Sequence, residues 1–327
     1  MKISRRQTLR SLAMAGVAFL CDRRSLLRAQ ASQAATPVHF QVPAGSCDCH
    51  VHVFGDPAKY PFAATRTYTP PGASTAELRR LLAALHMDRV VVVQPSVYGT
   101  DNRCTVDAIR ELGSRARGVA VIDDGTPDAA LDEMAHAGIR GIRINLTQGG
   151  VTDPAVALKR FERAAERAKR LNWHIQFNAS LKILDAISPH LLASPVLLVI
   201  DHFGGAAAAA GIQQPGFEAL LRLAGSGKAY VKISGAADLV SSEPHDYADV
   251  LPLARALVAA NSQRILWGTN WPHPDSRRVP GRRNTDIAPH MKTDDGRVLN
   301  LLPGWVPDAR VRQTILVENP ARLYGFT

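Results

Sequence analysis

The sequence predicts an α/β protein built as a single (β/α)8, or TIM, barrel. Eight short apolar runs of strand type are spread along the chain, and most are continuous rather than alternating, as expected of parallel strands buried on both faces. Helical patterns fill most of the gaps between these runs. An open, doubly wound sheet is the alternative, but no Gly-x-Gly-x-x-Gly motif follows a strand, which disfavours a dinucleotide-binding fold.

The expected strands are separated by intervals that leave room for a helix after most of them. Their residue ranges are 46–53, 89–94, 118–122, 139–144, 173–177, 196–200, 230–233 and 265–268. Once an N-terminal leader is set aside, about 290 residues remain, which suits one barrel domain over residues 36–327.

Three helix starts are marked by their capping residues. Residues 74–77, Ser-Thr-Ala-Glu, form a capping box that opens a helix to about residue 86. Thr126 and Asp153 each precede a proline, which favours a cap followed by a first-turn proline. The helix after Asp153 is expected to run through residue 170 with a charged, solvated face. The alanine run 206–210 is interpreted as a loop or a short helix.

The first 35 residues have the features of a twin-arginine export signal. Arg5 and Arg6 precede an apolar run over residues 12–20, and small residues follow at positions 29–35. The run is too short to span a bilayer of about 30 Å as a helix, but it has the length of a signal-peptide core. Thr8 departs from the usual pattern, which has a bulky apolar residue there. We therefore expect an exported, periplasmic protein.

Most of the net positive charge of the chain lies in this leader. Of 39 Lys and Arg residues and 29 Asp and Glu residues, seven basic and one acidic residue fall within positions 1–35, which leaves a formal charge of +4 in place of +10. Such a balance predicts no nucleic-acid partner, and no later apolar run is long enough for a membrane span. Three cysteines remain, Cys47, Cys49 and Cys104, and their number and spacing predict no disulfide scaffold. Nothing in the sequence indicates an oligomeric state.

The first expected strand, Ser-Cys-Asp-Cys-His-Val-His-Val, places two histidines two residues apart. Because side chains alternate in a strand, we expect Asp48, His50 and His52 on one face and the two cysteines with Val51 on the other. Two imidazoles on one face could converge on a metal ion or on a polarised carbonyl. Taken alone, the pair could equally be two ordinary polar positions.

Polar residues stand at the carboxyl ends of all eight expected strands, where barrel enzymes collect their catalytic groups. In strand order they are His50 and His52; Gln94, Ser96 and Tyr98; Asp123 and Asp124; Arg143 and Asn145; Gln176 and Asn178; Asp201 and His202; Lys232 and Ser234; Thr269, Asn270 and His273. Any one of these could cap or bond a loop. Eight polar ends together predict an active site.

Several of these segments resemble the amidohydrolase superfamily, in its amidohydrolase-2 branch of small-lactone enzymes. The similar segments are 48–52, 94–102, 141–143, 201–202, 267–274 and 317–326, and the resemblance extends over nearly the whole mature chain. It implies a (β/α)8 hydrolase that acts on a small anionic lactone, with lactone isomerisation as an alternative. It also implies that His50, His52 and His202 polarise the substrate carbonyl or hold one divalent metal.

The chain departs from metal-rich members of the superfamily, which place a lysine or glutamate at strand four and a histidine at strand five. In this chain the strand-four position is occupied by Arg143 and Asn145, and the strand-five position by Asn178. His174 lies at the opposite end of the fifth strand. A bridged two-metal centre is therefore not expected. Three imidazoles could hold one Zn²⁺ with an open position for water or substrate, and a metal-free mechanism also remains open.

Asn270 is the second departure, because most relatives have an aspartate there that takes the proton from the attacking water. An amide accepts no proton at neutral pH, and a general base contributes about 10²–10⁴ in rate. Three explanations of Asn270 are open. A metal-bound hydroxide could make the base dispensable, or a substrate hydroxyl could replace water as the nucleophile and give isomerisation. In the third, the protein only binds its ligand and catalyses no reaction. Hydrolysis is favoured because both first-strand histidines are present. The isomerase that this chain resembles has a glutamine at the first histidine position.

Cationic side chains predict the charge of the substrate. Arg143 and Lys232 stand at strand ends, and arginine forks suit carboxylates and sulfonates, so uncharged lactones are expected to be poor substrates. Asn270 is expected to act with the three histidines through hydrogen bonding. The expected substrate-binding residues are Ser96, Tyr98, Arg143, Asn178, Lys232 and His273.

Overall fold

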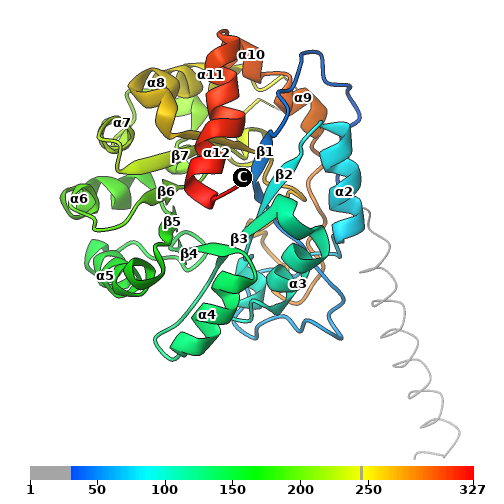
Figure 1. The fold of residues 1–327 in the computed structure, drawn as a ribbon, viewed down its shortest axis with the longest axis vertical. Helices are drawn as coiled ribbons and strands as arrows, with labels where there is room; N and C mark the ends of the chain where they lie inside the picture. The colour runs from blue at the N-terminus through cyan, green and yellow to red at the C-terminus, as the bar shows by residue number, and fades with distance from the viewer. Residues whose placement is uncertain (1–30, 244–245) are drawn as a thin grey trace, which may run out of the picture.

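The computed structural model describes residues 31–243 and 246–327, and its centre is a barrel of eight parallel strands (Figure 1). The strands are β1 (Cys47–Val51), β2 (Arg89–Val93), β3 (Ala116–Ala120), β4 (Ile139–Asn145), β5 (His174–Asn178), β6 (Leu198–Ile200), β7 (Ala229–Ser234) and β8 (Ile265–Gly268). They pair in sequence order from β1 to β8. The predicted (β/α)8 barrel is confirmed, with all eight strands within a few residues of their expected bounds. The predicted leader lies outside the described residues except for positions 31–35.

The barrel closes where the chain beyond β8 returns to the end of β1. The amide of Asn270 donates to the carbonyl oxygen of His50 at 2.9 Å, and the amide of His52 donates to the carbonyl oxygen of Trp271 at 2.8 Å. These bonds bring the end of the first strand beside the end of the eighth. Closure therefore joins residues that are more than 200 positions apart in the sequence.

Helices surround the strands, with one long helix after each of the first seven (Figure 1). These are α2 (Thr75–Ala84), α3 (Arg103–Leu112), α4 (Asp128–His136), α5 (Pro154–Leu171), α6 (Leu181–Leu192), α7 (Phe217–Gly225) and α8 (Leu251–Asn261). Four short helices follow β8: α9 (Asp295–Leu299), α10 (Leu302–Trp305), α11 (Ala309–Gln313) and α12 (Asn319–Tyr324). Within the described ranges, no helix is both long and apolar enough to cross a membrane.

Two of the three predicted helix starts are confirmed. Ser74 caps α2 in a complete capping box with Glu77, and Asp153 caps α5 by accepting a hydrogen bond from the amide of Ala155. Thr126 does not cap α4, which begins one residue later than expected. The hydroxyl of Thr126 donates to the carboxylate of Asp123 at 2.9 Å and so helps to hold the turn that precedes the helix. The alanine run contains one short turn of 3-10 helix, at residues 208–210.

Alternate strand residues pack into two separate cores. The interior core fills the barrel and consists of Cys47, Cys49, Val91, Val93, Val119, Val199, Tyr230, Leu266, Tyr324 and Phe326. The intervening strand residues, such as Val92 and Val231, pack outward in the larger core. Tyr324 comes from α12, which lies across one end of the barrel in Figure 1. All three described cysteines are buried and free, in agreement with the prediction of no disulfide scaffold.

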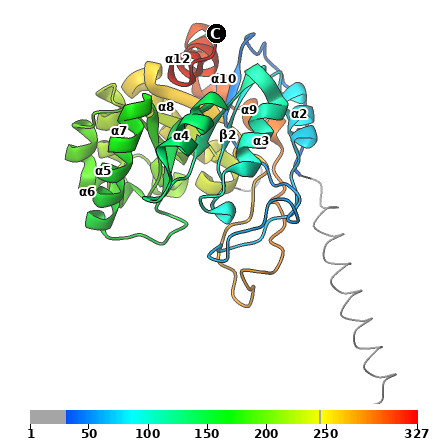
Figure 2. The ribbon, with the colours of Figure 1, turned by 60° about the horizontal axis from the view of Figure 1, so that its bottom comes forward.

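Two long connections lie at the opposite, carboxyl end of the strands. The segment between β1 and α2 and the segment between β8 and α9 run side by side in Figure 2. They are joined where the amide of Ala288 donates to the carbonyl oxygen of Thr69 at 2.8 Å. This paired cover places Tyr68 and Ser276 around the mouth of the barrel.

Candidate active site

The histidines of β1 reach the carboxyl end of the barrel, but the predicted division of faces is wrong. Cys47 and Cys49 pack in the interior on the same side as the histidines, whereas Val51 packs outward and Asp48 does not join the histidines. The register of β1 against β2 shifts between Asp48 and Val51. Cys49 packs in the interior core, and the next residue, His50, also reaches into the barrel. The Asp48 carboxylate instead accepts hydrogen bonds from the amide and the hydroxyl of Thr269, at 3.1 and 2.7 Å. Asp48 therefore holds the seam between β1 and β8.

Asp201 is the centre of a buried charged cluster. Its Oδ1 atom lies 3.2 Å from Nδ1 of His50 and 3.5 Å from Nζ of Lys232. Its Oδ2 atom accepts a hydrogen bond from the Gln176 amide at 3.1 Å and lies 3.4 Å from the Arg143 guanidinium. Lys232 also donates to Oε1 of Gln176 at 2.8 Å. One carboxylate thus has two cations and an amide as neighbours, which compensates the cost of burying its charge.

His52 and His202 are each oriented by a hydrogen bond at Nδ1. Nδ1 of His52 lies 2.7 Å from the carbonyl oxygen of Val93. A carbonyl only accepts, so Nδ1 carries the proton and Nε2 of His52 has a free lone pair. Nδ1 of His202 lies 2.9 Å from Oγ of Ser234. The His50 ring is near both, with its centroid 5.0 Å from that of His52 and 4.4 Å from that of His202.

Burial keeps all three imidazoles neutral. Desolvation lowers the pKa of His52 to about 3 and holds the pKa of His50 well below its ordinary value. It also lowers the pKa of His202, although the Asp201 carboxylate opposes this shift. Burial alone would raise the pKa of Asp201, but His50 and Lys232 overcome that effect and hold it well below its usual range. The site therefore combines neutral imidazoles with an ionised aspartate.

His50, Asp201 and His202 form a group that could hold a metal ion, since their ligand atoms all lie within 4.8 Å of one another. Nε2 of His50 is buried without a hydrogen-bond partner, and neutral imidazole is a good ligand for divalent metals. The donor set therefore fits one divalent cation. His52, which we expected as the third ligand, lies outside the group, and Asp201 replaces it.

A second buried network lies behind Asn270. Its amide nitrogen donates to Oδ2 of Asp238 at 2.7 Å, so the carbonyl end of the same side chain is left for the cavity that Asn270 lines. Oδ2 of Asp238 also lies 3.4 Å from Nδ1 of His273, whose Nε2 is 2.9 Å from Asp295. Burial would lower the pKa of His273, but the two aspartates raise it to about 10. His273 is thus an imidazolium between two carboxylates.

These groups surround a cavity of about 260 Å³ at the carboxyl ends of the strands, which we call the site cavity. Six of the predicted site residues line it: His52, Ser96, Arg143, Asn178, His202 and Asn270. His50 and Lys232 lie beneath this lining in the Asp201 cluster, and His273 lies behind Asn270. The structure therefore brings nine of the ten predicted residues to the cavity or into the clusters that support it.

Tyr98 is the predicted substrate-binding residue that the structure places elsewhere. Its ring is buried against Phe62, with centroids 5.4 Å apart, and its hydroxyl accepts a hydrogen bond from the amide of Gly55 at 3.0 Å. It does not line the site cavity. The short helical turn Ser96–Tyr98 explains the difference, because it leaves Ser96 at the cavity and carries Tyr98 into the packing below the β1–α2 connection.

Sequence reasoning missed the carboxylates that support the site. Asp201 is one of the polar strand ends in the sequence but has no role predicted for it, and neither Asp238 nor Asp295 is predicted from the sequence as a site residue. Asp238 follows β7 by four residues, and this place just beyond a strand end is the one signal that could have drawn attention to it. No local pattern marks Asp295, which sits in α9 and meets His273 only through the folded chain.

Fold and site together define a (β/α)8 enzyme with a histidine-rich active site at the carboxyl ends of its strands. The family model described as amidohydrolase matches residues 47–326, and the chain belongs to this family.

The relatives of the chain include enzymes of lactone chemistry. It is 35% identical over 295 residues to a 4-sulfomuconolactone hydrolase from Hydrogenophaga intermedia, which covers 88% of this chain and 91% of the relative. It is 35% identical to a 2-pyrone-4,6-dicarboxylate hydrolase from Comamonas testosteroni, over 87% of this chain and 92% of the relative. It is 32% identical to a D-galactarolactone isomerase from Agrobacterium fabrum, again over 87% and 92%.

The fold also has a solved counterpart. An apo structure from Agrobacterium tumefaciens matches with a TM-score of 0.74 and 29% identity, and the match covers 89% of this chain and 99% of that one.

Proposed function

We propose that this protein hydrolyses a small lactone that carries a carboxylate or sulfonate group. The observation that carries the proposal is the site cavity, in which the imidazoles of His52 and His202, the Arg143 guanidinium and the Asn270 amide meet at the strand ends. The relatives named as hydrolases of a sulfonated and of a dicarboxylated lactone support it. Arg143 matches the anionic group of such a substrate, since guanidinium forks bind carboxylates and sulfonates.

Each cavity side chain has a role that follows from its hydrogen bonds. Nε2 of His52 has a free lone pair and accepts a hydrogen bond from the attacking water. Asn270, anchored through its nitrogen on Asp238, presents its carbonyl oxygen as a second acceptor for that water. Lys232 and Arg143 hold positive charge beside the cavity, which favours the negative charge that develops on the lactone carbonyl oxygen.

We propose that His50, Asp201 and His202 hold one divalent metal, with zinc as the ion. When bound, it would supply Lewis-acid polarisation of the lactone carbonyl. Zinc titration of metal-stripped protein, followed by calorimetry and metal analysis, tests this without reference to activity. His202→Asn should abolish stoichiometric binding, and His290→Asn, which alters a histidine outside the group, should leave it intact. Equal binding by both variants would remove the group as a metal site.

Isomerisation is the second candidate, and Asn270 is the observation that favours it. A substrate hydroxyl can replace water as the nucleophile, in which case no strand-eight carboxylate is needed to activate water. The isomerase relative fits this alternative. The mass of the product decides: hydrolysis adds one water to the lactone, and isomerisation conserves its mass. Binding of anionic lactones without either product would identify a catalytically silent relative.

We also propose that the protein is exported through the twin-arginine route, on the strength of Arg5, Arg6 and the apolar run that follows them. Cell fractionation of the full-length chain should find it in the periplasm. The double substitution Arg5→Lys and Arg6→Lys should retain it in the cytoplasm. Periplasmic recovery of that variant would contradict the proposal.

A further inference from the structure

Within the described ranges of the chain, no aspartate or glutamate lines the site cavity, so a nucleophile bound there meets no carboxylate. Asp201 lies beneath the lining, where its two oxygens already have His50, Lys232 and Arg143 as neighbours. Water and alcohols are weak nucleophiles unless a base takes their proton as they attack. The proton of the nucleophile therefore needs another path out of the cavity.

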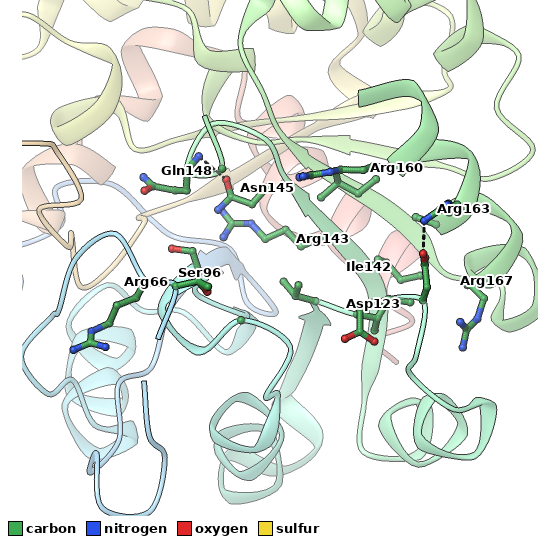
Figure 3. Close-up of a pocket in the computed structure, with 18 of the residues that line it drawn as sticks. Arg66, Ser96, Asp123, Ile142, Arg143, Asn145, Gln148, Arg160, Arg163 and Arg167 are labelled. Carbon is green, nitrogen blue, oxygen red and sulfur yellow. Dashed lines mark hydrogen bonds and ion pairs between the residues drawn. The ribbon is translucent and has the colours of Figure 1, made fainter. Parts of the chain in front are cut away.

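The hollow next to the site cavity does not supply a carboxylate either. It lies at the ends of β3 and β4, and three arginines of α5, which we expected on a solvated face, line it together with Asp123 and Asp124 (Figure 3). Arg163 forms an ion pair with Asp124, drawn as the dashed line in Figure 3. Neither aspartate lines the site cavity, so any carboxylate that serves the nucleophile lies behind the cavity wall.

Asp238 is a carboxylate directly behind that wall. It belongs to one turn of π-helix, Ala236–Val240, which follows β7, and such turns are frequent at functional sites. The turn begins after Gly235, whose φ of +66° suits glycine and whose Cβ would meet Leu239 at 2.9 Å. Leu239 lines the site cavity, while the side chain of Asp238 is only 1% exposed and lies against Asn270. The turn therefore places a carboxylate behind Asn270, out of reach of a substrate.

Asn270 connects the site cavity to Asp238. Its amide nitrogen donates to Oδ2 of Asp238 at 2.7 Å, which leaves its carbonyl oxygen for the cavity. Its backbone is held on both sides, because its N–H donates to the carbonyl oxygen of His50 and its C=O accepts from the N–H of His273. The side chain thus spans from the cavity to the carboxylate in one fixed orientation.

Asp238 is ionised and has capacity for a proton. Burial would raise its pKa, but the His273 imidazolium and the hydrogen bond from Asn270 hold that pKa below its ordinary value. Its Oδ1 atom is buried and has no hydrogen-bond partner among the described residues. A buried carboxylate with an unpaired oxygen is costly to keep charged, so a proton transferred to Asp238 relieves part of that cost.

We propose that Asp238 accepts the proton of the nucleophile through the side chain of Asn270, which acts as a proton relay. The inference rests on the proposed lactone chemistry of the site cavity and adds to it the base that position 270 lacks. It applies equally to hydrolysis and to isomerisation, because the nucleophile is water in the first and a substrate hydroxyl in the second. Asp238 acts through Asn270 and does not touch the substrate.

The relay moves two protons in one step. As the nucleophile oxygen bonds to the lactone carbonyl carbon, its proton passes to Oδ1 of Asn270, and a proton on Nδ2 passes to Oδ2 of Asp238. The amide becomes its imidic-acid tautomer, Asp238 becomes neutral, and the lactone carbonyl oxygen takes the electron pair of the broken π bond. When the ring C–O bond breaks, the leaving oxygen takes the proton from Oδ1 of Asn270, and Asp238 returns its own proton to Nδ2. An isolated amide is too weak a base for this role, but here it gains one proton only as it gives up another.

Single-turnover rates on a panel of γ- and δ-lactones that carry a carboxylate or a sulfonate test the relay. Asp238→Asn should lower the rate about 100-fold and leave KM unchanged, at the lower end of what a general base contributes, because His52 still accepts a hydrogen bond from the nucleophile. Asn270→Asp combined with Asp238→Asn places the carboxylate at the cavity and should restore most of the lost rate. This double variant keeps one amide and one carboxylate in contact, so it serves even if Asp238→Asn does not fold.

Rates in mixtures of H₂O and D₂O separate a relay from a merely structural contact. The wild-type rate should fall along a curve as the fraction of D₂O rises, because two protons move, and the rate of the double variant should fall along a line, because one proton moves. Asp249→Asn is the matched control. The Asp249 carboxylate accepts hydrogen bonds from Ser241 and Ser242 in the same connection and does not line the site cavity, so this variant should match the wild type in rate and in curvature.

Four results would overturn the relay and leave the lactone reaction standing. They are an unchanged rate in Asp238→Asn, an equal loss in Asp249→Asn, a linear dependence on D₂O in the wild type, and a folded double variant that stays as slow as Asp238→Asn. A wild type that converts no lactone of the panel, by hydrolysis or by isomerisation, would overturn the proposed reaction and the relay with it.

Discussion

Replacing Asn270 by aspartate should destabilise the protein at neutral pH. In the structure, the Asn270 amide nitrogen lies 2.7 Å from Oδ2 of Asp238, whose side chain is 1% exposed. Asn270→Asp would put two carboxylates in contact in a buried place, and such a pair retains one proton between them. The same carboxyl group in the unfolded chain has a pKa of about 3.9.

The cost follows from proton linkage. Because the folded pKa is raised above the unfolded value, there is no penalty below about pH 4, and the penalty grows by about 1.4 kcal/mol per pH unit above it. A proton retained at pH 7 therefore costs about 4 kcal/mol, reduced by the nearby His273 imidazolium. Urea unfolding midpoints at pH 5, 6 and 7 should show a deficit relative to the wild type that increases with pH.

Two further variants make the test specific. Asn270→Asp combined with Asp238→Asn restores one amide and one carboxylate and should recover most of the lost stability. Asn178→Asp, the same change at a cavity residue whose amide meets only Asn145, should show a much smaller pH-dependent loss. The double variant should also hydrolyse lactone faster at pH 7 than the single variant, because its carboxylate is ionised. An Asn270→Asp protein that matches the wild type at every pH would refute the contact with an ionised Asp238.

Three other predictions concern single residues of the site. The pKa of His273 is raised to about 10, so its contribution to stability is complete below about pH 6.5 and is lost as the pH rises through 10. The urea midpoint of the wild type should therefore fall at alkaline pH, and His273→Gln should flatten that decline. Parallel declines of the wild type and the variant would contradict the assignment of His273 as an imidazolium. Ser234→Ala removes the partner of His202 Nδ1 and should lower zinc affinity or kcat/KM by about tenfold with an unchanged thermal midpoint. Arg143→Gln should raise KM for a carboxylated lactone by about tenfold without changing the turnover of an uncharged one, and an equal effect on both would show that Arg143 only supports Asp201.

The order of the strands and helices could be predicted from the sequence because it depends on local patterns. The eight apolar runs and the caps at Ser74 and Asp153 act over a few residues, and each is visible without knowledge of the fold. The end of a barrel strand is likewise a local feature. That is why His52, Arg143 and Asn270 could be assigned to one cavity.

The contacts that define the chemistry depend on barrel closure, and no local pattern encodes them. The register shift in β1 gives Asp48 to the seam and leaves Asp201 as the carboxylate beside His50. The short turn after β2 withdraws Tyr98 from the cavity. In both cases a local irregularity of the backbone, a register shift in β1 and a helical turn after β2, redirects a side chain, and sequence periodicity does not resolve so small a change.

By itself, then, the sequence determined the barrel, the histidines of its first strand and the amide at position 270, because these follow from residue identity and short-range periodicity. Only the tertiary structure decided that Asp238 lies against Asn270 and that the arginines of α5 face a cavity beside the site. Those contacts join residues from separate elements, and the distance between such residues is fixed by the register and closure of the barrel.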